Sequence, residues 1–140
     1  MCIRDRIEIA ERRPDLLIYA YTKSLPFWVA RLDRIPKNLI LTASMGGKFD
    51  YLIEQHQLRY AKVVFSPEEA VALGLEIDHD DSHAQRHGLS FALLIHGIQP
   101  KGSAAAAAQH DLKRRGIKFA YSRKPTTATA VAALDSGNRQ

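Results

Sequence analysis

Polar side chains that follow an apolar run are the first candidates for chemistry in this chain. The run at residues 16–20 is followed by Tyr21, Thr22, Lys23 and Ser24, which supply a phenol, two hydroxyls and an ammonium. An ammonium group suits an anionic ligand, or acts as a base when it is buried. We predict Lys23 as a catalytic residue and the other three as ligand-binding residues. In the alternative interpretation, the two hydroxyls cap the next helix and Lys23 is solvated.

A second apolar run, residues 38–43, leads into Ser44 and the glycine pair Gly46 and Gly47. Glycines let backbone N–H groups approach a ligand at the start of a helix, where the helix dipole favours anions. The spacing differs from the Gly-x4-Gly-Lys-Ser/Thr pattern of a P-loop. We predict Ser44, Gly46 and Gly47 as ligand-binding residues, although a plain strand-to-helix turn explains the glycines equally well.

A later apolar run, residues 89–95, ends at His96, which we predict as the second catalytic residue. Its place after a strand puts it on the same sheet edge as Lys23 and Ser44. A lone histidine at such a position is also explained by burial and hydrogen bonding.

Residues 78–83 hold the densest set of metal-ligand side chains in the sequence. His79, Asp81 and His83 alternate, so an extended segment would place them on one side, as nitrogen and oxygen ligands of a divalent metal. We predict a metal site here. Two alternatives stay open: the residues hydrogen-bond to one another or to the backbone, or His79 or His83 is an acid or base.

The elements that would position these residues alternate along the chain as helix and strand. Residues 16–20 are apolar at both odd and even positions, which point to opposite faces of a strand. This pattern predicts a parallel strand that is covered on both faces. Parallel strands joined by helices bring their carboxyl ends to one edge, where α/β proteins place their sites. We predict an α/β fold with a parallel sheet, most naturally the carboxyl-terminal half of a TIM-barrel-like (β/α) domain. A small open doubly wound sheet is the alternative.

Local signals set several helix ends. Ser66 followed by Pro67 predicts a helix start, as does Ser103 before an alanine run, and Gly116 predicts a stop. Phe27 and Trp28 are interpreted as core packing, with base stacking as the alternative.

The composition bounds the class of protein. A chain of 140 residues supports one core. No apolar stretch approaches the roughly 20 residues of a membrane helix, and the start does not read as a signal peptide. We therefore expect a cytoplasmic protein with no membrane association. The single cysteine excludes an intrachain disulfide and a cysteine-ligated metal or Fe–S cofactor within this chain.

The net charge of +5 is carried largely by the chain ends, which leaves only weak support for nucleic acid as a partner. We expect residues 1–6 to be a non-native or disordered leader, because this opening resembles one that recurs on open reading frames from short-read environmental assemblies. Residues 7–122 are predicted as the α/β domain. Residues 123–140, rich in Thr and Ala, are predicted as a disordered tail.

Five strings of the sequence together carry a family resemblance: AERRPD at residues 10–15, YAYTKSLPFWV at 19–29, LTAS at 41–44, GLEIDHDDSHA at 74–84 and FALLIHG at 91–97. They resemble the gene product 88 family, a mostly phage-encoded family of unknown activity. Its relatives carry, upstream, a cysteine-containing segment and a stretch reading like Ser-Gly-Asp-Phe. The resemblance implies that an amino-terminal half of the same protein is a missing partner.

Two functions follow as hypotheses. A cysteine-bearing amino half joined to a barrel-like carboxyl half is similar in layout to Fe–S or radical-SAM enzymes, an analogy at the level of fold. The first hypothesis is thus a cofactor-dependent enzyme that takes a small molecule or anionic ligand at the carboxyl edge of the strands. The second is a non-catalytic, phage-derived module that associates with nucleic acid or a host protein. A pocket that holds Lys23 and His96 together would favour the first, and a continuous basic face with exposed aromatics the second.

Overall fold

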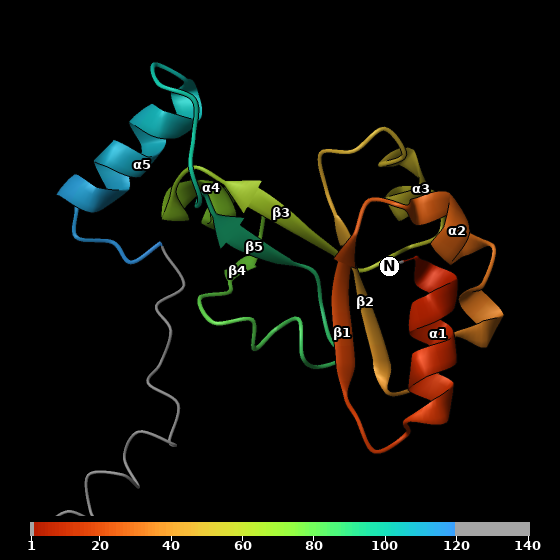
Figure 1. The fold of residues 1–140 in the computed structure, drawn as a ribbon. Coiled ribbons are helices and arrows are strands. Elements are labelled where there is room, and N and C mark those ends of the chain that lie inside the picture. The colour runs from red at the N-terminus through yellow and green to blue at the C-terminus, as the bar shows by residue number, and fades with distance from the viewer. Residues whose placement is uncertain (1, 120–140) are drawn as a thin grey trace, which may run out of the picture.

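The computed structural model describes residues 2–119 and contains one five-stranded, all-parallel sheet with helices between the strands (Figure 1). The strand order is β1-β2-β3-β5-β4. The predicted parallel α/β class is confirmed. The elements are α1 (Ile3–Arg12), β1 (Ile18–Thr22), α2 (Leu25–Val29), the 3-10 helix η1 (Leu32–Arg34), β2 (Leu39–Ser44), α3 (Tyr51–Gln55), β3 (Tyr60–Val64), α4 (Pro67–Ala72), β4 (Glu76–Ile77), β5 (Phe91–Leu94) and α5 (Ala104–Arg114).

The predicted helix ends are formed by the expected side chains. The Ser66 hydroxyl accepts from the Glu69 N–H at 3.2 Å, and the Ser103 hydroxyl accepts from the Ala106 N–H at 3.1 Å. Each hydroxyl accepts from a backbone N–H of the first helical turn, which has no acceptor within the helix itself. Gly116, which follows α5, has a φ of +68°, a conformation that glycine adopts without a Cβ penalty.

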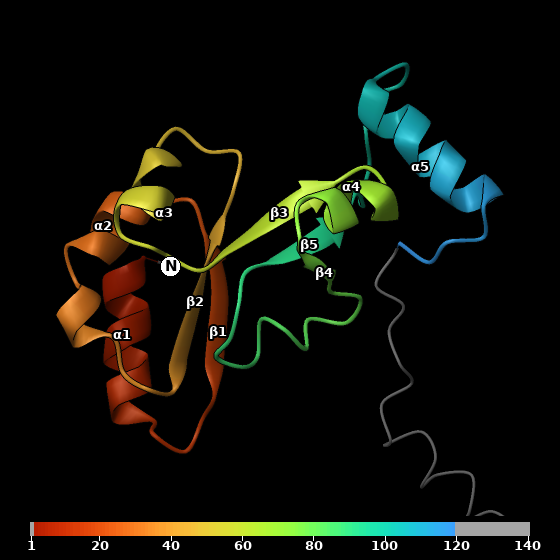
Figure 2. The same ribbon diagram turned by 180° about the vertical axis from the view of Figure 1, so that it is seen from behind.

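Helices α1, α2 and α3 lie on one face of β1 and β2, as Figures 1 and 2 show from opposite sides. Their buried side chains form the amino-terminal core with those of β2 and Leu58. The members are Ile3, Ile7, Ala10, Leu25, Trp28, Leu39, Leu41, Ala43, Leu52, Ile53 and Leu58. Burial of each large side chain contributes about 1.5–3 kcal/mol, so this core fixes how α1 and α2 meet the end of β1.

The sheet continues into a second core through a narrow connection. Strands β2 and β3 pair only at Ala43–Tyr60 and Ser44–Ala61, so β3 begins where β2 ends. Beyond this stagger, α4 and α5 pack on β3 and β5 to form the carboxyl-terminal core: Val64, Ala70, Ala92, Leu94, Ile95 and Leu112. A third, small cluster, which we name the joint, consists of Ala61, Ala84 and Phe91.

The opposite face of the sheet carries a loop in place of helices. Residues 78–90, the 78–90 loop, run from β4 to β5 and reach back toward β1 in both ribbon views (Figures 1 and 2). On β1, Ile18 and Ala20 pack on the amino-terminal core, but Tyr19 is 38% exposed, and Leu17, just before the strand, is 55% exposed. The expectation that this strand is covered on both faces was therefore wrong, because the loop covers only part of the second face.

Other expectations differ in detail. Helix α1 begins at Ile3, which is buried, so residues 3–6 of the expected non-native or disordered leader are part of a helix. The short strand β4 is not among the predicted elements. A (β/α)8 barrel keeps its strands in chain order, whereas here β5 lies between β3 and β4. The half-barrel prediction is not confirmed, and the predicted tail lies outside the described residues.

No helix within residues 2–119 combines the length and apolar character that crossing a membrane requires.

Candidate functional site

The end of β1 is fixed by local hydrogen bonds. The buried Thr22 hydroxyl accepts from the Ser24 N–H at 3.0 Å, which turns the chain into α2. The Lys23 ammonium donates to the carbonyls of Ser44 and Met45, both at 3.0 Å. Lys23 and Ser44 are thus brought together, as the shared strand edge predicted, and Lys23 ties β1 to the loop after β2.

The glycine loop binds an anion that belongs to the chain itself. The Gly46 and Gly47 N–H groups donate to the two carboxylate oxygens of Asp50, at 2.7 and 2.9 Å. Paired backbone amides form a nest that favours negative charge. The predicted amide cradle therefore exists, and Asp50 occupies it.

A cavity of about 530 Å³ opens between the start of α1, the end of β1 and α2. Its walls are predominantly basic and hydroxylic, and they contain no acidic residue. The lining residues are Cys2, Ile3, Arg4, Arg6, Tyr21, Thr22, Lys23, Ser24, Phe27 and Arg31. We name it the basic cavity. It contains all four residues predicted at the end of β1.

The positive charge of the basic cavity is only partly balanced. Arg4 lies 3.8 Å from an Asp5 oxygen and 3.9 Å from a Glu8 oxygen. Arg6, Lys23 and Arg31 make no ion pair with a carboxylate anywhere in residues 2–119. Three uncompensated cations beside one cavity favour an anionic ligand.

His96 lies on the same sheet edge but away from the basic cavity. Across the β2–β3–β5 ladders, Ser44 is level with Phe91, and His96 comes five residues further along, roughly 16 Å at 3.3 Å per residue. Its Nδ1 donates to the Leu94 carbonyl at 2.8 Å, because a carbonyl only accepts. Lys23 and His96 therefore do not share a site.

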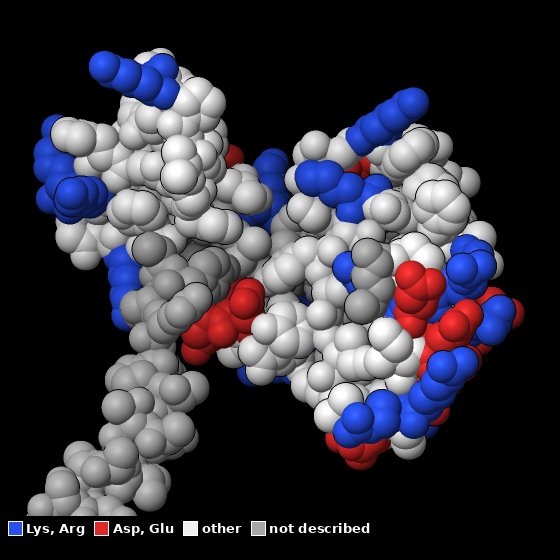
Figure 3. Space-filling model, viewed as in Figure 1, with Lys and Arg blue, Asp and Glu red and all other residues white. Residues whose placement is uncertain are grey.

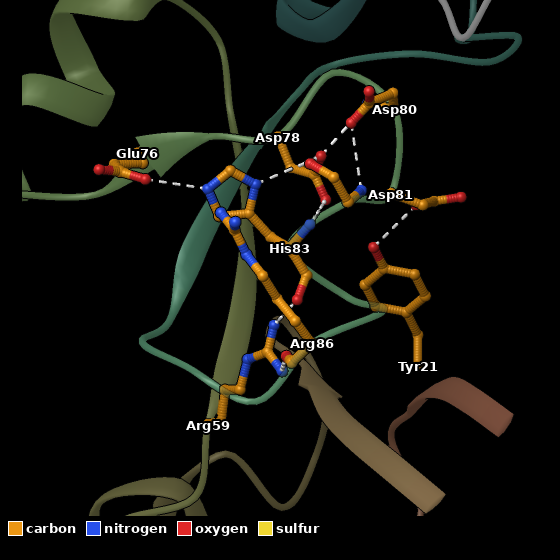
Figure 4. Close-up of polar contacts among 9 residues, drawn as sticks. Tyr21, Arg59, Glu76, Asp78, Asp80, Asp81, His83 and Arg86 are labelled. Carbon is orange, nitrogen blue, oxygen red and sulfur yellow. Dashed lines mark hydrogen bonds and ion pairs between the residues drawn. The ribbon is translucent and has the colours of Figure 1, made fainter. Parts of the chain in front are cut away.

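The 78–90 loop is organised around the buried carboxylate of Asp78 (Figure 4). Asp78 accepts from the N–H groups of Asp80 and His83, both at 3.2 Å. The His83 ring lies between two carboxylates, with Nε2 2.9 Å from Glu76 and Nδ1 3.4 Å from Asp78. Hydrogen bonding to His83 lowers the pKa of Glu76. These contacts match the interpretation in which the residues bond to one another.

The metal site predicted from His79, Asp81 and His83 required an extended segment, and the segment is not extended. Asp81 has a φ of +62° and accepts from the Tyr21 hydroxyl at 3.0 Å. His79 is exposed. Within residues 2–119, no three His, Cys, Asp or Glu side chains are grouped so that they could hold a metal ion.

Arg59, which the sequence analysis did not single out, anchors the 78–90 loop to β3. Its guanidinium donates to the carbonyls of His83 and Arg86 (Figure 4). The same guanidinium lies over the Phe91 ring, 5.1 Å from its centroid. Burial lowers the pKa of Arg59, opposed by Tyr21 and Asp78. Arg59, Glu76, His83 and Arg86 also line a second pocket of about 590 Å³.

The model of one protein family, gene product 88, matches residues 2–116. The chain belongs to the gene product 88 family. No curated protein and no solved structure matches it.

Within this gene product 88 chain, the strings that carried the resemblance fall on both structural features of the site. Residues 19–29 supply five of the residues around the basic cavity, from Tyr21 to Phe27. Residues 74–84 hold the carboxylates and the histidine of the 78–90 loop network. The Tyr21–Asp81 hydrogen bond links the two.

Proposed function

We propose that this gene product 88 domain binds a small phosphate-bearing molecule in the basic cavity. The observation that carries the proposal is the lining: four basic side chains and two hydroxyl side chains, Thr22 and Ser24, with no acidic residue. A volume of about 530 Å³ is in the range of pockets that hold small ligands.

The donors suit phosphate more than other anions. Guanidinium groups match phosphate oxygens in a two-pronged geometry, and charge-assisted hydrogen bonds to them are strong. The Lys23 ammonium donates two of its three N–H groups to carbonyls, which leaves one N–H for a ligand. The Thr22 hydroxyl oxygen accepts from Ser24, so its hydrogen is available to donate.

The separation of Lys23 from His96 favours binding over a reaction carried by these two residues. The cofactor-dependent enzyme hypothesis placed both in one pocket, and the basic cavity contains only Lys23. The uncompensated cations are specific support for an anion site.

Calorimetric titration with ribose 5-phosphate at low salt tests the proposal. We expect saturable binding to the wild-type chain, and a loss of about tenfold in affinity for Arg6→Gln and for Arg31→Gln, because each removes one charge-assisted contact. Added salt should weaken binding, since the attraction is between partly exposed charges.

Arg12→Gln is the matched control, because Arg12 lies on the same helix as Arg6 but is exposed and outside the cavity. It should bind ribose 5-phosphate as the wild type does. An absence of binding, or an equal loss in Arg12→Gln, would contradict the proposal.

A further inference from the structure

Phe27 is an aromatic side chain that the protein leaves uncovered at the wall of the basic cavity. Within α2, Leu25 and Trp28 are buried in the amino-terminal core at 1% and 7% exposure, whereas Phe27 is 62% exposed. The interpretation of both aromatics as core was right for Trp28 and wrong for Phe27. Phe27 is thus an aromatic ring at the cavity wall that the core leaves available to a ligand.

Phe27 shares the wall of the basic cavity with a cation that the core does not use. The Arg31 guanidinium donates to the Phe27 carbonyl at 3.1 Å, and both side chains line the cavity. An apolar ring face beside phosphate-binding cations matches the two halves of a nucleotide, because bases stack on aromatic side chains while the phosphate takes the charged contacts.

We propose that the ligand of the basic cavity is a nucleoside monophosphate whose base stacks on Phe27. This inference rests on the proposed phosphate-binding function and adds the class of ligand. A single nucleotide, and not a nucleic-acid strand, fits the distribution of charge. On the face drawn in Figure 3, Lys and Arg form separate groups with uncharged and acidic residues between them, where a strand would need a continuous basic track.

Parallel titrations with adenosine monophosphate, ribose 5-phosphate and adenosine test the inference. We expect adenosine monophosphate to bind the wild type at least tenfold more tightly than ribose 5-phosphate, because only the former can stack. Phe27→Ala should remove that advantage, so that adenosine monophosphate binds this variant no more tightly than ribose 5-phosphate does. Phe27→Leu, which keeps apolar area without a ring, should retain only part of it.

Phe65→Ala is the control, since Phe65 is also a partly exposed phenylalanine but lies outside the cavity. It should keep the full advantage of the nucleotide. Equal affinities of the wild type for the two phosphates would overturn the nucleotide inference while the phosphate-binding function stands. Binding of neither phosphate would overturn both. Much tighter binding of a ten-nucleotide oligothymidylate than of thymidine monophosphate would show that the ligand is a nucleic-acid strand and not a single nucleotide.

Discussion

Gly46 and Gly47 are neighbours that donate to the same carboxylate, yet they place different demands on the backbone. Gly46 has a φ of +97°, and a Cβ there would lie 3.6 Å from the Lys23 ammonium nitrogen. We expect Gly46→Ala to reduce the free energy of unfolding by about 1–2 kcal/mol, because an L side chain is strained at that φ. Urea denaturation followed by circular dichroism measures the loss.

Gly47→Ala is the comparison for that strain. Its φ is outside the left-handed region, and its Cβ would meet Asp50 and Lys23 atoms at 3.5 Å, an ordinary contact distance. Its free energy of unfolding should stay within about 1 kcal/mol of the wild type. Equal losses in both variants would show that the backbone conformation at Gly46 is not the cause.

At this scale, the sequence predicted which residues gather at the strand edge but not how their polar groups are satisfied. The proximity of Lys23 to Ser44 follows from the parallel pairing of β1 and β2. The capture of the glycine amides by Asp50 was missed, although an Asp four residues after Gly46 was a signal for it. The type of a residue limits which partners its polar groups can bind, and the backbone conformation determines which partner is within reach.

The position of the 78–90 loop, like the polar partners of the glycine loop, could not be predicted from the sequence. Arg59 holds this loop through two carbonyls that lie 24 and 27 residues away in sequence, and its guanidinium also covers Phe91. We expect Arg59→Met to reduce the free energy of unfolding by about 1–3 kcal/mol, since it leaves both carbonyls without this charged donor. Hydrogen exchange should accelerate most in residues 83–90.

Arg86→Met is the control for this substitution. The backbone carbonyl of Arg86 accepts from Arg59, and Arg86 itself is exposed. The same change of side chain at Arg86 should therefore leave hydrogen exchange of the loop nearly unaltered. If Arg59→Met left the exchange rates of residues 83–90 at wild-type values, the anchoring role would be refuted.

Elements whose limits depend on neighbouring residues were predictable, and those that depend on distant ones were not. The starts of α4 and α5 follow from Ser66 and Ser103, whose hydroxyls bond only three residues ahead. Strand β4 is two residues long and exists because it pairs with β5, fifteen positions further on, at Glu76–Phe91 and Ile77–Ala92. No local pattern signals such a pairing.

The molecule as a whole consists of two cores with a narrow connection. The amino-terminal core and the carboxyl-terminal core lie on either side of the β2–β3 stagger, where two residue pairs form the ladder. The joint strengthens this connection. Phe91 is fully buried there, with its ring centroid 6.3 Å from Tyr21 of β1 and 5.4 Å from His83 of the loop. We infer that Phe91 makes the two cores unfold as one unit.

Phe91→Ala tests this inference. Truncation of a buried phenylalanine costs about 3–5 kcal/mol, and here the loss falls between the cores. Trp28, the only tryptophan, reports the amino-terminal core by fluorescence, while far-UV ellipticity reports helices of both cores. We expect the two urea transitions to coincide in the wild type and to separate in Phe91→Ala.

Leu112→Ala is the control. It removes a fully buried side chain within the carboxyl-terminal core, so it should shift both transitions together. Coincident transitions in Phe91→Ala would mean that the β2–β3 ladder and the loop couple the cores without the joint.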